Sequence, residues 1–428
     1  MESAKKHVHI LGIGGSAASG IAQIAKAYGY EVTGCDRAES TPYIEKAQKA
    51  GIKTFVGHDA AHLEGVDIVA VSPALLYQNA NHPEMVAARD AGKLMTWQQF
   101  LGEHLQQDKF VICIAGTHGK STTTTLAGLV LEGADLDPTV EVGATVPAWH
   151  NNVRIGASKY FISEADEFND NFKHYRPDVI VLNNIEMDHP EYFKTEENML
   201  AAFQRFIDQL KPGGTLIYNT DSPLIHKLHL PQDAIAYTAN DYEASTFPLS
   251  VPGAHNRSNA LGVIALARLL HIPDDATARA LKSFTGIGRR IELIGESNGI
   301  KVYDDYANHP TAFAASIASI RELNPSGKIW AVIEPHTFSR LRAVLPELPA
   351  SVKAADEVIV SKIYASREQD PGDFTGADIV AAMQHPHARY IPAFADIVTT
   401  IKAEARPGDS ILVMGSGDSY MLARDILA

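Results

Sequence analysis

The stretch AGTHGKSTTTT, residues 115–125, decides the fold of the middle of this chain. It follows the apolar run FVICIA (110–115) and precedes the helix-like run TTTTLAGLVLEGA, so it joins a strand to a helix. Backbone N–H groups and the helix N-terminus at such a junction favour a bound phosphate. Lys120 adds a positive charge, and the Ser121 hydroxyl can meet a magnesium ion that bridges phosphates. We therefore predict an ATP-binding loop that reads G-T-H-G-K-S at 116–121 and is shorter than the common G-x-x-x-x-G-K-[ST].

Residues 1–104 predict a small Rossmann-like domain ahead of that loop. The strand HVHILGIGG (7–15) passes through glycines into the helical run 16–30 and then the strand EVTGCD (31–36). Helices over 41–52 and 82–92 and a strand over 67–73 continue the alternation. Asp36 stands where a Rossmann domain often meets a ribose. The segment alone indicates a nucleotide diphosphate and leaves NAD open.

Residues 105–288 predict a largely parallel sheet that carries the phosphate loop at the carboxyl ends of its strands. Strands are expected over 160–165, 179–184 and 214–220, and helices over 195–210, 256–270 and 275–284. SEADEF and NNIEMDHPEYF each follow or end one of these strands. They place Glu164, Asp166 and Glu167, and Glu186, Asp188 and His189, where a magnesium site near the γ-phosphate could form.

Residues 289–428 predict a third α/β unit. The expected strands are KVYDDYA (301–307), KIWAVIE (328–334), EVIVSKIY (357–364) and SILVMGSG (410–417), with helices between them. The predicted fold class is therefore α/β with three domains. These are a Rossmann-like nucleotide-binding domain, a central P-loop ATPase-like parallel sheet and a C-terminal Rossmann-like domain.

Composition narrows the class of protein. The chain has 428 residues, a net charge of −14 and only two cysteines, Cys35 and Cys113. The acidic balance argues against general nucleic-acid binding, which needs clustered Lys and Arg. No apolar run approaches the roughly 20 residues of a membrane-spanning helix, so no membrane insertion is expected. The N-terminus shows no apolar signal region, so we expect a cytoplasmic protein with two buried free thiols.

Together these residues resemble the Mur ligases, the ATP-dependent amino-acid ligases of peptidoglycan precursor synthesis. The matching motifs cover almost the whole chain. They are G-T-x-G-K-[ST]-[ST]-T at 116–123, E-A-D-E at 164–167, N-I-E-x-D-H at 184–189, H-N-x-x-N-A at 255–260, R-R at 289–290, D-D-Y at 304–306, H-P-T at 309–311 and P-H-x-F-x-R at 335–340.

The resemblance is strongest to the branch of the family that adds L-alanine. It implies ATP-dependent joining of L-alanine to the lactyl carboxylate of UDP-N-acetylmuramate through an acyl phosphate. The products are UDP-N-acetylmuramoyl-L-alanine, ADP and phosphate. ATP and Mg²⁺ are the implied cofactors, and a monomer or weak homodimer is the implied assembly. The pathway would support cell-wall synthesis, cell shape and cell division.

The resemblance also assigns residues. For ATP it implies Gly116, Thr117, His118, Gly119, Lys120, Ser121, Thr122, Asn259 (with His255 nearby in its motif), Arg290 and Asp305. For the UDP-sugar it implies Gly12, Gly14, Gly15, Ser16, Asp36 and Ser72. For the amino acid it implies Tyr306, His336 and Arg340, and for the metal Ser121, Glu164 and His189. The implied catalytic groups are Lys120, His189, Glu164 and His309, while Arg289 and Asp304 stay near-equal candidates beside Arg290 and Asp305.

Three departures from the family pattern leave alternatives open. Ala17 and Ala18 stand where relatives carry Gly and Met, and Asn308 stands where the alanine branch has a histidine. Asn308 puts the choice of amino acid in doubt, so a recycling ligase that adds a murein tripeptide to the same UDP-sugar is the alternative. A non-catalytic nucleotide-binding scaffold would be expected to lose Lys120, Glu164 or His189. An NAD-dependent dehydrogenase would leave the 116–121 loop without a role.

Overall fold

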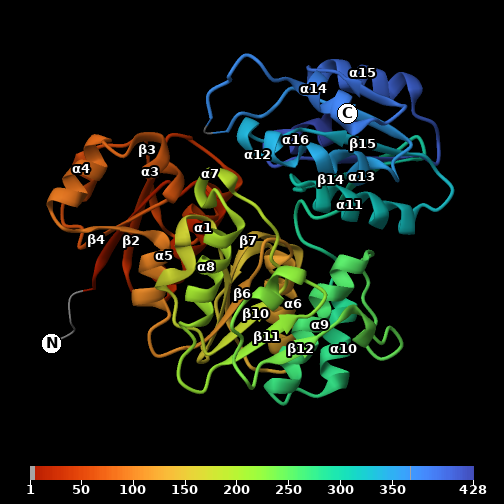
Figure 1. The fold of residues 1–428 in the computed structure, drawn as a ribbon. Coiled ribbons are helices and arrows are strands. Elements are labelled where there is room, and N and C mark those ends of the chain that lie inside the picture. Colours follow the sequence, from red (N-terminus) through yellow and green to blue (C-terminus); the bar gives the residue numbers. More distant parts are fainter. Residues whose placement is uncertain (1–4, 367) are drawn as a thin grey trace. The chain divides into compact units, whose positions relative to one another are not determined.

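The computed structural model describes residues 5–366 and 368–428. The chain divides into two compact units. Unit 1 contains the chain up to Glu186 together with Met199–Pro248 and Asn259–Ser283, and unit 2 contains Met187–Asn198, Leu249–Ser258 and Phe284–Ala428. Two β-sheets belong to unit 1 and a third belongs to unit 2 (Figure 1).

The first sheet is five-stranded and parallel, with strand order β3-β2-β1-β4-β5. Its strands are β1 (His7–Leu11), β2 (Glu31–Asp36), β3 (Lys53–Val56), β4 (Ile68–Val71) and β5 (Leu94–Thr96). The helical segments are α1 (Ser16–Ala27), α2 (Pro42–Lys49), η1 (Ala60–Leu63), α3 (Pro73–Asn79), α4 (Pro83–Asp90), α5 (Trp97–Phe100) and η2 (Leu101–Leu105). Because β1 is the central strand, the glycine turn that follows it lies between the carboxyl ends of β2 and β4.

The second sheet is seven-stranded, in the order β12-β11-β10-β6-β9-β7-β8, and only the β7–β8 pair is antiparallel. Its strands are β6 (Phe110–Ala115), β7 (Thr139–Val146), β8 (Asn151–Arg154), β9 (Tyr160–Ala165), β10 (Val179–Leu182), β11 (Thr215–Asn219) and β12 (Ile235–Tyr237). The helical segments along this part of the chain are α6 (Lys120–Gly133), η3 (Pro147–Trp149), η4 (Phe168–His174), α7 (Pro190–Phe193), α8 (Glu196–Ile207), η5 (Pro223–Lys227), η6 (Ala239–Asp241), α9 (Ala254–Leu269) and α10 (Asp274–Ser283). Of these, α7 and the first residues of α8 and α9 belong to unit 2. Because β6, β9 and β10 are parallel neighbours, their carboxyl ends lie side by side at the same end of the sheet.

The third sheet has the order β13-β14-β18-β15-β16-β17, with β13–β14 antiparallel and the other pairs parallel. Its strands are β13 (Glu292–Ser297), β14 (Ile300–Asp305), β15 (Ile329–Ile333), β16 (Glu357–Val360), β17 (Ala388–Tyr390) and β18 (Ser410–Met414). The helical segments are α11 (Pro310–Leu323), α12 (Phe338–Val344), η7 (Leu345–Glu347), α13 (Leu348–Val352), α14 (Gly376–Met383), α15 (Phe394–Glu404) and α16 (Ser419–Leu427).

Alternating residues of the third sheet supply two separate cores, as a sheet covered on both faces requires. Ala331 and Ile333 pack with α11, α13 and α14, whereas Trp330 and Val332 pack with α15 and α16. In Figure 1, α11 and α15 lie on opposite sides of this sheet. This doubly wound arrangement agrees with the predicted Rossmann-like third segment.

The predicted three-part α/β fold is confirmed, and the strands that the sequence did not reveal are mostly short or lie at sheet edges. β3, β5, β12 and β17 have three or four residues each, too few for a clear apolar period. The antiparallel strands β8 and β13 each form a sheet edge. The exact domain boundaries at residues 104 and 288 stay a prediction.

Candidate active site

The predicted phosphate loop lies between β6 and α6, and two of its glycines need left-handed backbone. Gly116 has a φ of 134° and Gly119 a φ of 82°. A side chain on Gly116 would meet the Asn184 carbonyl oxygen, and one on Gly119 would clash with the Asn259 amide. Glycine is therefore required here both by conformation and by close approach. Asn259, from α9, thus lies directly against the loop.

The chain after β10 holds the loop in place. The Thr117 hydroxyl donates to the Glu186 carbonyl oxygen over 3.0 Å and accepts from the Glu186 amide over 2.9 Å. The His118 amide donates to Asn184 Oδ1, and His118 Nε2 lies 2.7 Å from Glu186 Oε2. The loop is therefore pre-shaped by Asn184 and Glu186, side chains whose holding role the sequence did not reveal.

Lys120 begins α6 and is held by a carboxylate. Its ammonium donates to the Gly116 carbonyl oxygen over 2.7 Å and to Glu167 Oε2 over 2.6 Å. Burial by itself would lower the pKa of Lys120, but Glu167 and the neighbouring Asp166 and Glu164 raise it above its ordinary value. The ammonium is therefore charged and fixed at the mouth of the loop, where it can meet a phosphate.

The threonines after Ser121 continue into α6, as predicted. Thr123, Thr124 and Thr125 are fully buried. The Thr123 hydroxyl accepts from Asn183 Nδ2, and the Thr125 hydroxyl donates to the Ser121 carbonyl oxygen. These three side chains are therefore part of the helix packing, and the first turn of α6, with Ser121 and Thr122, carries the N–H groups that lack helical partners.

Glu164, the last residue but one of β9, lies beside a second carboxyl group that the sequence did not single out. Glu164 Oε1 accepts from the Gly143 amide over 2.5 Å. Glu141, on the adjacent strand β7, is buried, and burial followed by the charge of Glu164 raises its pKa well above the ordinary value. The only signal in the sequence was an acidic residue inside an apolar strand.

The glycine turn after β1 is held by Asp36. Gly12 has a φ of 80°, and the Gly14 amide donates to Asp36 Oδ2 over 2.9 Å. Ser16 begins α1, and its hydroxyl oxygen is buried without a hydrogen-bond partner among the described residues. Ser72 follows β4 and lies against Gly12. Gly15 lies between Gly14 and Ser16. The six residues expected at the UDP-sugar are therefore close together at the carboxyl ends of β1, β2 and β4.

The first domain contacts the second sheet through α1 and α2. The Tyr28 hydroxyl donates to Thr139 Oγ1 over 2.9 Å, and Lys46 donates to Thr145 Oγ1 over 2.7 Å. Asn152 Nδ2 donates to the Ser16 carbonyl oxygen over 2.7 Å. The start of α1, where the departures Ala17 and Ala18 stand, is thus fastened to β8.

In unit 2, Asp188 is paired with Arg340. Arg340 Nε lies 2.9 Å from Asp188 Oδ1, and the side chains of both are almost entirely buried. Burial by itself would raise the pKa of Asp188, but His189 and Arg340 hold it below its ordinary range. Arg340 Nη1 lies 3.4 Å from His336 Nδ1, and the His336 ring stacks on Tyr364. The structure therefore brings together Asp188, His189, His336 and Arg340.

The two arginines at 289–290 differ in their surroundings. Arg289 Nε lies 3.2 Å from Asp304 Oδ2, and its Nη2 donates to the Gly415 carbonyl oxygen and to Ser419 Oγ. Arg290 is exposed, with its guanidinium 5.2 Å from the centre of the Tyr306 ring. Arg289 is thus held within the unit, and Arg290 faces solvent.

Asp305 and His309 hold backbone in this part of unit 2. The Asp305 carboxylate accepts from the amides of Ile291 and Ala307, over 2.8 and 2.7 Å. Burial raises the pKa of Asp305, against the charge of Arg290. His309 is buried and caps α11, where its Nδ1 accepts from the Thr311 amide. Both side chains therefore shape the loop that presents Tyr306.

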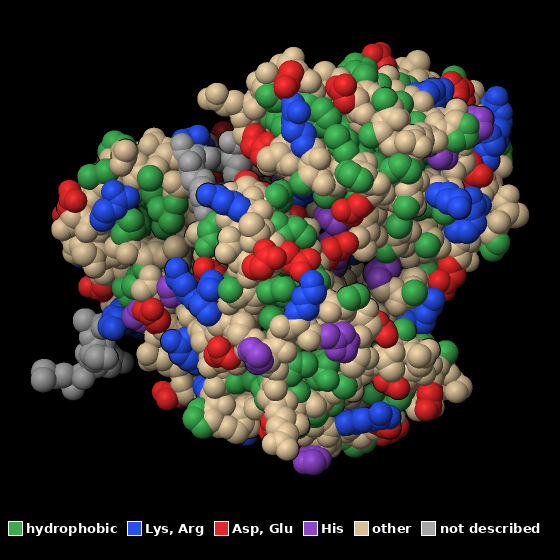
Figure 2. All heavy atoms as spheres, in the orientation of Figure 1, with side chains coloured by type: hydrophobic (Ala, Val, Ile, Leu, Met, Phe, Trp, Pro, Cys, Tyr) green, Lys and Arg blue, Asp and Glu red, His purple; other side chains and the backbone are tan. Residues whose placement is uncertain are grey.

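Surface charge and helix length add two observations. Acidic and basic side chains are interspersed over the face drawn in Figure 2. Among the described residues, no helix combines the length and apolar character that crossing a bilayer requires. Both cysteines are free and buried, as predicted.

Three family models match successive parts of the chain. They are the Mur ligase family catalytic domain at residues 7–109, the Mur ligase middle domain at 114–246 and the Mur ligase glutamate ligase domain at 289–417. The chain is 34% identical to the UDP-N-acetylmuramate–L-alanine ligases of Alkaliphilus metalliredigens and Acetivibrio thermocellus. The two alignments cover 99% of this chain and 97% and 96% of those proteins. The chain therefore belongs to the Mur ligase family.

Solved structures share the fold. The UDP-N-acetylmuramate–alanine ligase of Thermotoga maritima superposes with a TM-score of 0.81 at 24% identity, covering 98% of each chain. A murein peptide ligase from Psychrobacter arcticus superposes with a TM-score of 0.71 at 26% identity, covering 99% of this chain and 98% of that one. The likeness extends over all three sheets.

Proposed function

We propose that this protein is an ATP-dependent ligase that joins L-alanine to the lactyl carboxylate of UDP-N-acetylmuramate. The products are UDP-N-acetylmuramoyl-L-alanine, ADP and phosphate, and the reaction is a step of peptidoglycan precursor synthesis. The observation that carries the proposal is the 34% identity, over 99% of this chain, to enzymes named for that reaction. The shaped phosphate loop and the held ammonium of Lys120 supply the matching chemistry.

The reaction has two steps in this proposal. A lactyl carboxylate oxygen attacks the γ-phosphorus of ATP, the bond to the bridging oxygen breaks and ADP leaves. The amine nitrogen of alanine then attacks the acyl carbon, phosphate leaves with the bonding electrons, and the amine gives up a proton. Negative charge on phosphoryl oxygens is stabilised by the α6 N-terminus and by Lys120, which can pass from Glu167 to the phosphate.

The carboxylates near Lys120 fit a hard divalent cation. Glu164, Asp166 and Glu167 gather where β9 ends, and oxygen donors of this kind suit Mg²⁺. We assign Ser121, Glu164 and His189 as the groups that hold it, following the family motifs. The ion would neutralise phosphate charge during transfer. His189 lies in unit 2, so its share in this site is part of the proposal.

The other ligands are assigned by motif and local geometry. The UDP-sugar is placed at Gly12, Gly14, Gly15, Ser16, Asp36 and Ser72, where the buried Ser16 hydroxyl and the α1 N-terminus offer donors to a diphosphate. ATP is placed at the 116–122 loop with Asn259, Arg290 and Asp305. The exposed Arg290 is favoured over Arg289, which is already bonded to Asp304.

The amino acid is placed at Tyr306, His336 and Arg340, with His309 as a further catalytic candidate. Arg340 already pairs with Asp188 through Nε, but a guanidinium has five N–H donors and can hold a second carboxylate through its Nη groups. We also propose a cytoplasmic enzyme acting as a monomer or weak homodimer.

A recycling ligase that adds a tripeptide remains the second candidate, because murein peptide ligases share this fold. The test measures phosphate release from ATP with UDP-N-acetylmuramate, Mg²⁺ and one acceptor at a time. The acceptors are L-Ala, Gly, L-Ser and L-Ala–γ-D-Glu–diaminopimelate. We expect the largest release with L-Ala. Release with the tripeptide alone would assign the recycling reaction, and no release with any acceptor would contradict the proposed substrates.

A further inference from the structure

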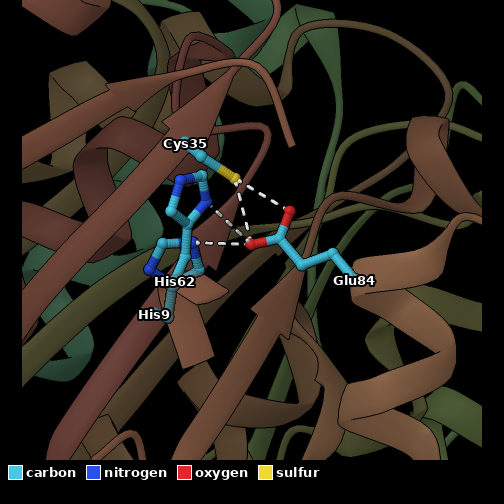
Figure 3. Close-up of side chains that lie close together, drawn as sticks. All are labelled: His9, Cys35, His62 and Glu84. Carbon is cyan, nitrogen blue, oxygen red and sulfur yellow. Dashed lines mark hydrogen bonds and ion pairs between the residues drawn. The ribbon is translucent and has the colours of Figure 1, made fainter. Parts of the chain in front are cut away.

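Four metal-ligand side chains meet in the first domain, and none of them is used in the proposed reaction, although Cys35 directly precedes Asp36. They are His9 from β1, Cys35 from β2, His62 from η1 and Glu84 from α4. One donor atom from each lies within 4.8 Å of the other three. Figure 3 shows the thiol and both imidazoles pointing toward the Glu84 carboxylate. Their sequence separation hides this cluster from any motif search.

The register of the sheet explains the meeting. His9 pairs with Thr33 and Leu11 pairs with Cys35 on the neighbouring parallel strand. Alternate residues share a face, so His9 and Cys35 project from the same side of the sheet. On that side η1 packs against α4, which brings His62 and Glu84 over the two strands. The fold therefore builds the cluster from four elements.

Three of the donor distances, all measured from the Glu84 carboxylate, are close to those around a small tetrahedral ion. Glu84 Oε1 lies 3.2 Å from His62 Nδ1, 3.3 Å from His9 Nε2 and 3.6 Å from Cys35 Sγ. An ion with bonds of about 2.0–2.3 Å sets its ligand atoms about 3.3–3.5 Å apart in a tetrahedron. The spacing around the carboxylate is therefore close to that of a loaded site before any rearrangement.

Burial and charge also favour a cation. The side chains of Glu84 and His9 are 0% exposed, and the ion pairs of Glu84 among the described residues are all with imidazoles, those of His9, His58 and His62. A buried carboxylate is costly unless it is paired or coordinates a metal. With Cys35 as thiolate, the two anionic donors would balance a divalent ion. The neutral imidazoles would complete its shell.

Side chains around the cluster orient the donors. His9 Nδ1 lies 2.8 Å from Thr33 Oγ1, which leaves Nε2 facing Glu84. The His62 ring stacks on Phe55 with centres 4.4 Å apart. Supporting contacts of this kind fix ring orientation in metal sites.

We propose that His9, Cys35, His62 and Glu84 bind one divalent transition-metal ion of the zinc class. His58, whose Nδ1 lies 3.1 Å from Cys35 Sγ, stands beside the site as a supporting or exchanging ligand. Four protein ligands leave no open position, which defines a structural ion rather than a catalytic one. The ion would tie β1, β2, η1 and α4 together. It would also fix the end of β2, where Asp36 holds the glycine turn.

Metal binding must release the Cys35 proton. Burial, followed by the charge of Glu84, raises the pKa of the Cys35 thiol in the metal-free protein. Zn²⁺ coordination deprotonates a thiol outright. If no metal binds, the cluster is a hydrogen-bonded group of thiol, carboxylate and imidazoles. The metal-bound and metal-free forms therefore differ in whether Cys35 is a thiolate, which can be measured.

The test uses untagged, full-length protein stripped of metal and titrated with Co²⁺ and then Zn²⁺. We expect one Co²⁺ per chain, with a thiolate-to-cobalt charge-transfer band and intense tetrahedral visible bands, both lost on adding one Zn²⁺. Cys35→Ser should remove the charge-transfer band, whereas Cys113→Ser, at the other buried cysteine, should keep it. Folded wild-type protein that shows no such band, or an unchanged band in Cys35→Ser, would overturn the proposal.

A second variant covers the case in which Cys35→Ser does not fold. His62 is partly exposed, so His62→Ala should fold and lose at least about 100-fold in Co²⁺ affinity, as direct ligand loss exceeds the effect of outer partners. His226→Ala, at η5 beside the second sheet, is the matched control and should bind Co²⁺ as the wild type does. Equal affinity of His62→Ala and wild type would also overturn the proposal.

Discussion

Each unit contains a positively charged side chain paired with a buried carboxylate, and the two pairs differ in what else the positively charged side chain contacts. In unit 1, Lys120 meets Glu167 at 2.6 Å, and in unit 2, Arg289 meets Asp304 at 3.2 Å. Lys120 is itself the group at the phosphate loop. Arg289 is bonded to backbone and to Ser419 as well, and the neighbouring Arg290 is exposed. The R-R motif therefore does not say which of the two arginines is available to bind a ligand. The hydrogen-bond partners of each side chain determine that.

The largest effect is expected from Lys120→Ala. Loss of a charge that stabilises the transferring phosphoryl group should lower kcat by about 10³-fold. Phosphate release under saturating substrates measures it. Since the variant leaves Glu167 buried without its cation, it should also lose stability.

The double variant Lys120→Ala/Glu167→Gln separates the two effects. It removes the uncompensated charge, so melting temperature should recover while turnover stays low. Near-wild-type turnover in either variant would refute the assignment of Lys120 to the phosphate.

The second prediction contrasts Arg290→Ala with Arg289→Ala. Arg290→Ala should raise KM for ATP by about 10-fold, the loss of one charged hydrogen bond, with almost no change in melting temperature. Arg289→Ala should instead lower the free energy of unfolding by about 3 kcal/mol, because Asp304 stays buried and unpaired. Kinetics and thermal melts of both variants decide between them. The reverse pattern would make Arg289 the ATP ligand.

The third prediction concerns pH and Asp304. Burial raises the pKa of its carboxyl from 3.8 to about 6, against the opposing charge of Arg289. The native state then holds the proton more tightly than the unfolded chain, so stability is highest below pH 4 for this group and falls as pH rises to 6. About two pKa units correspond to about 3 kcal/mol.

Denaturant unfolding of the wild type and Asp304→Asn between pH 4 and 7 measures this contribution. The wild type should lose stability relative to Asp304→Asn across that interval. Parallel pH profiles for the two proteins would show that Asp304 is ionised throughout.

Much of the fold and of the reaction chemistry was predictable from local pattern. The strands β1, β2, β6, β9 and β10, the glycine turns and α6 appear in the sequence because each is contiguous and has a strong period. Lys120 and the carboxylates of 164–167 were singled out from local motifs, and the arginine pair from the resemblance to the family. Short edge strands such as β17 escaped because three residues carry almost no periodic signal.

The sequence by itself determined the family, the three-part α/β architecture and the residue types at the phosphate loop, since these depend on neighbours along the chain. Only the tertiary structure decided which residue pairs with which. Glu167 holds Lys120, Asn184 and Glu186 shape the loop, and Asp188 occupies one edge of Arg340. The meeting of His9, Cys35, His62 and Glu84 is likewise visible only in the tertiary structure. Sheet register and helix packing bring distant residues together, and pairwise distance and burial then set their charge and their partners.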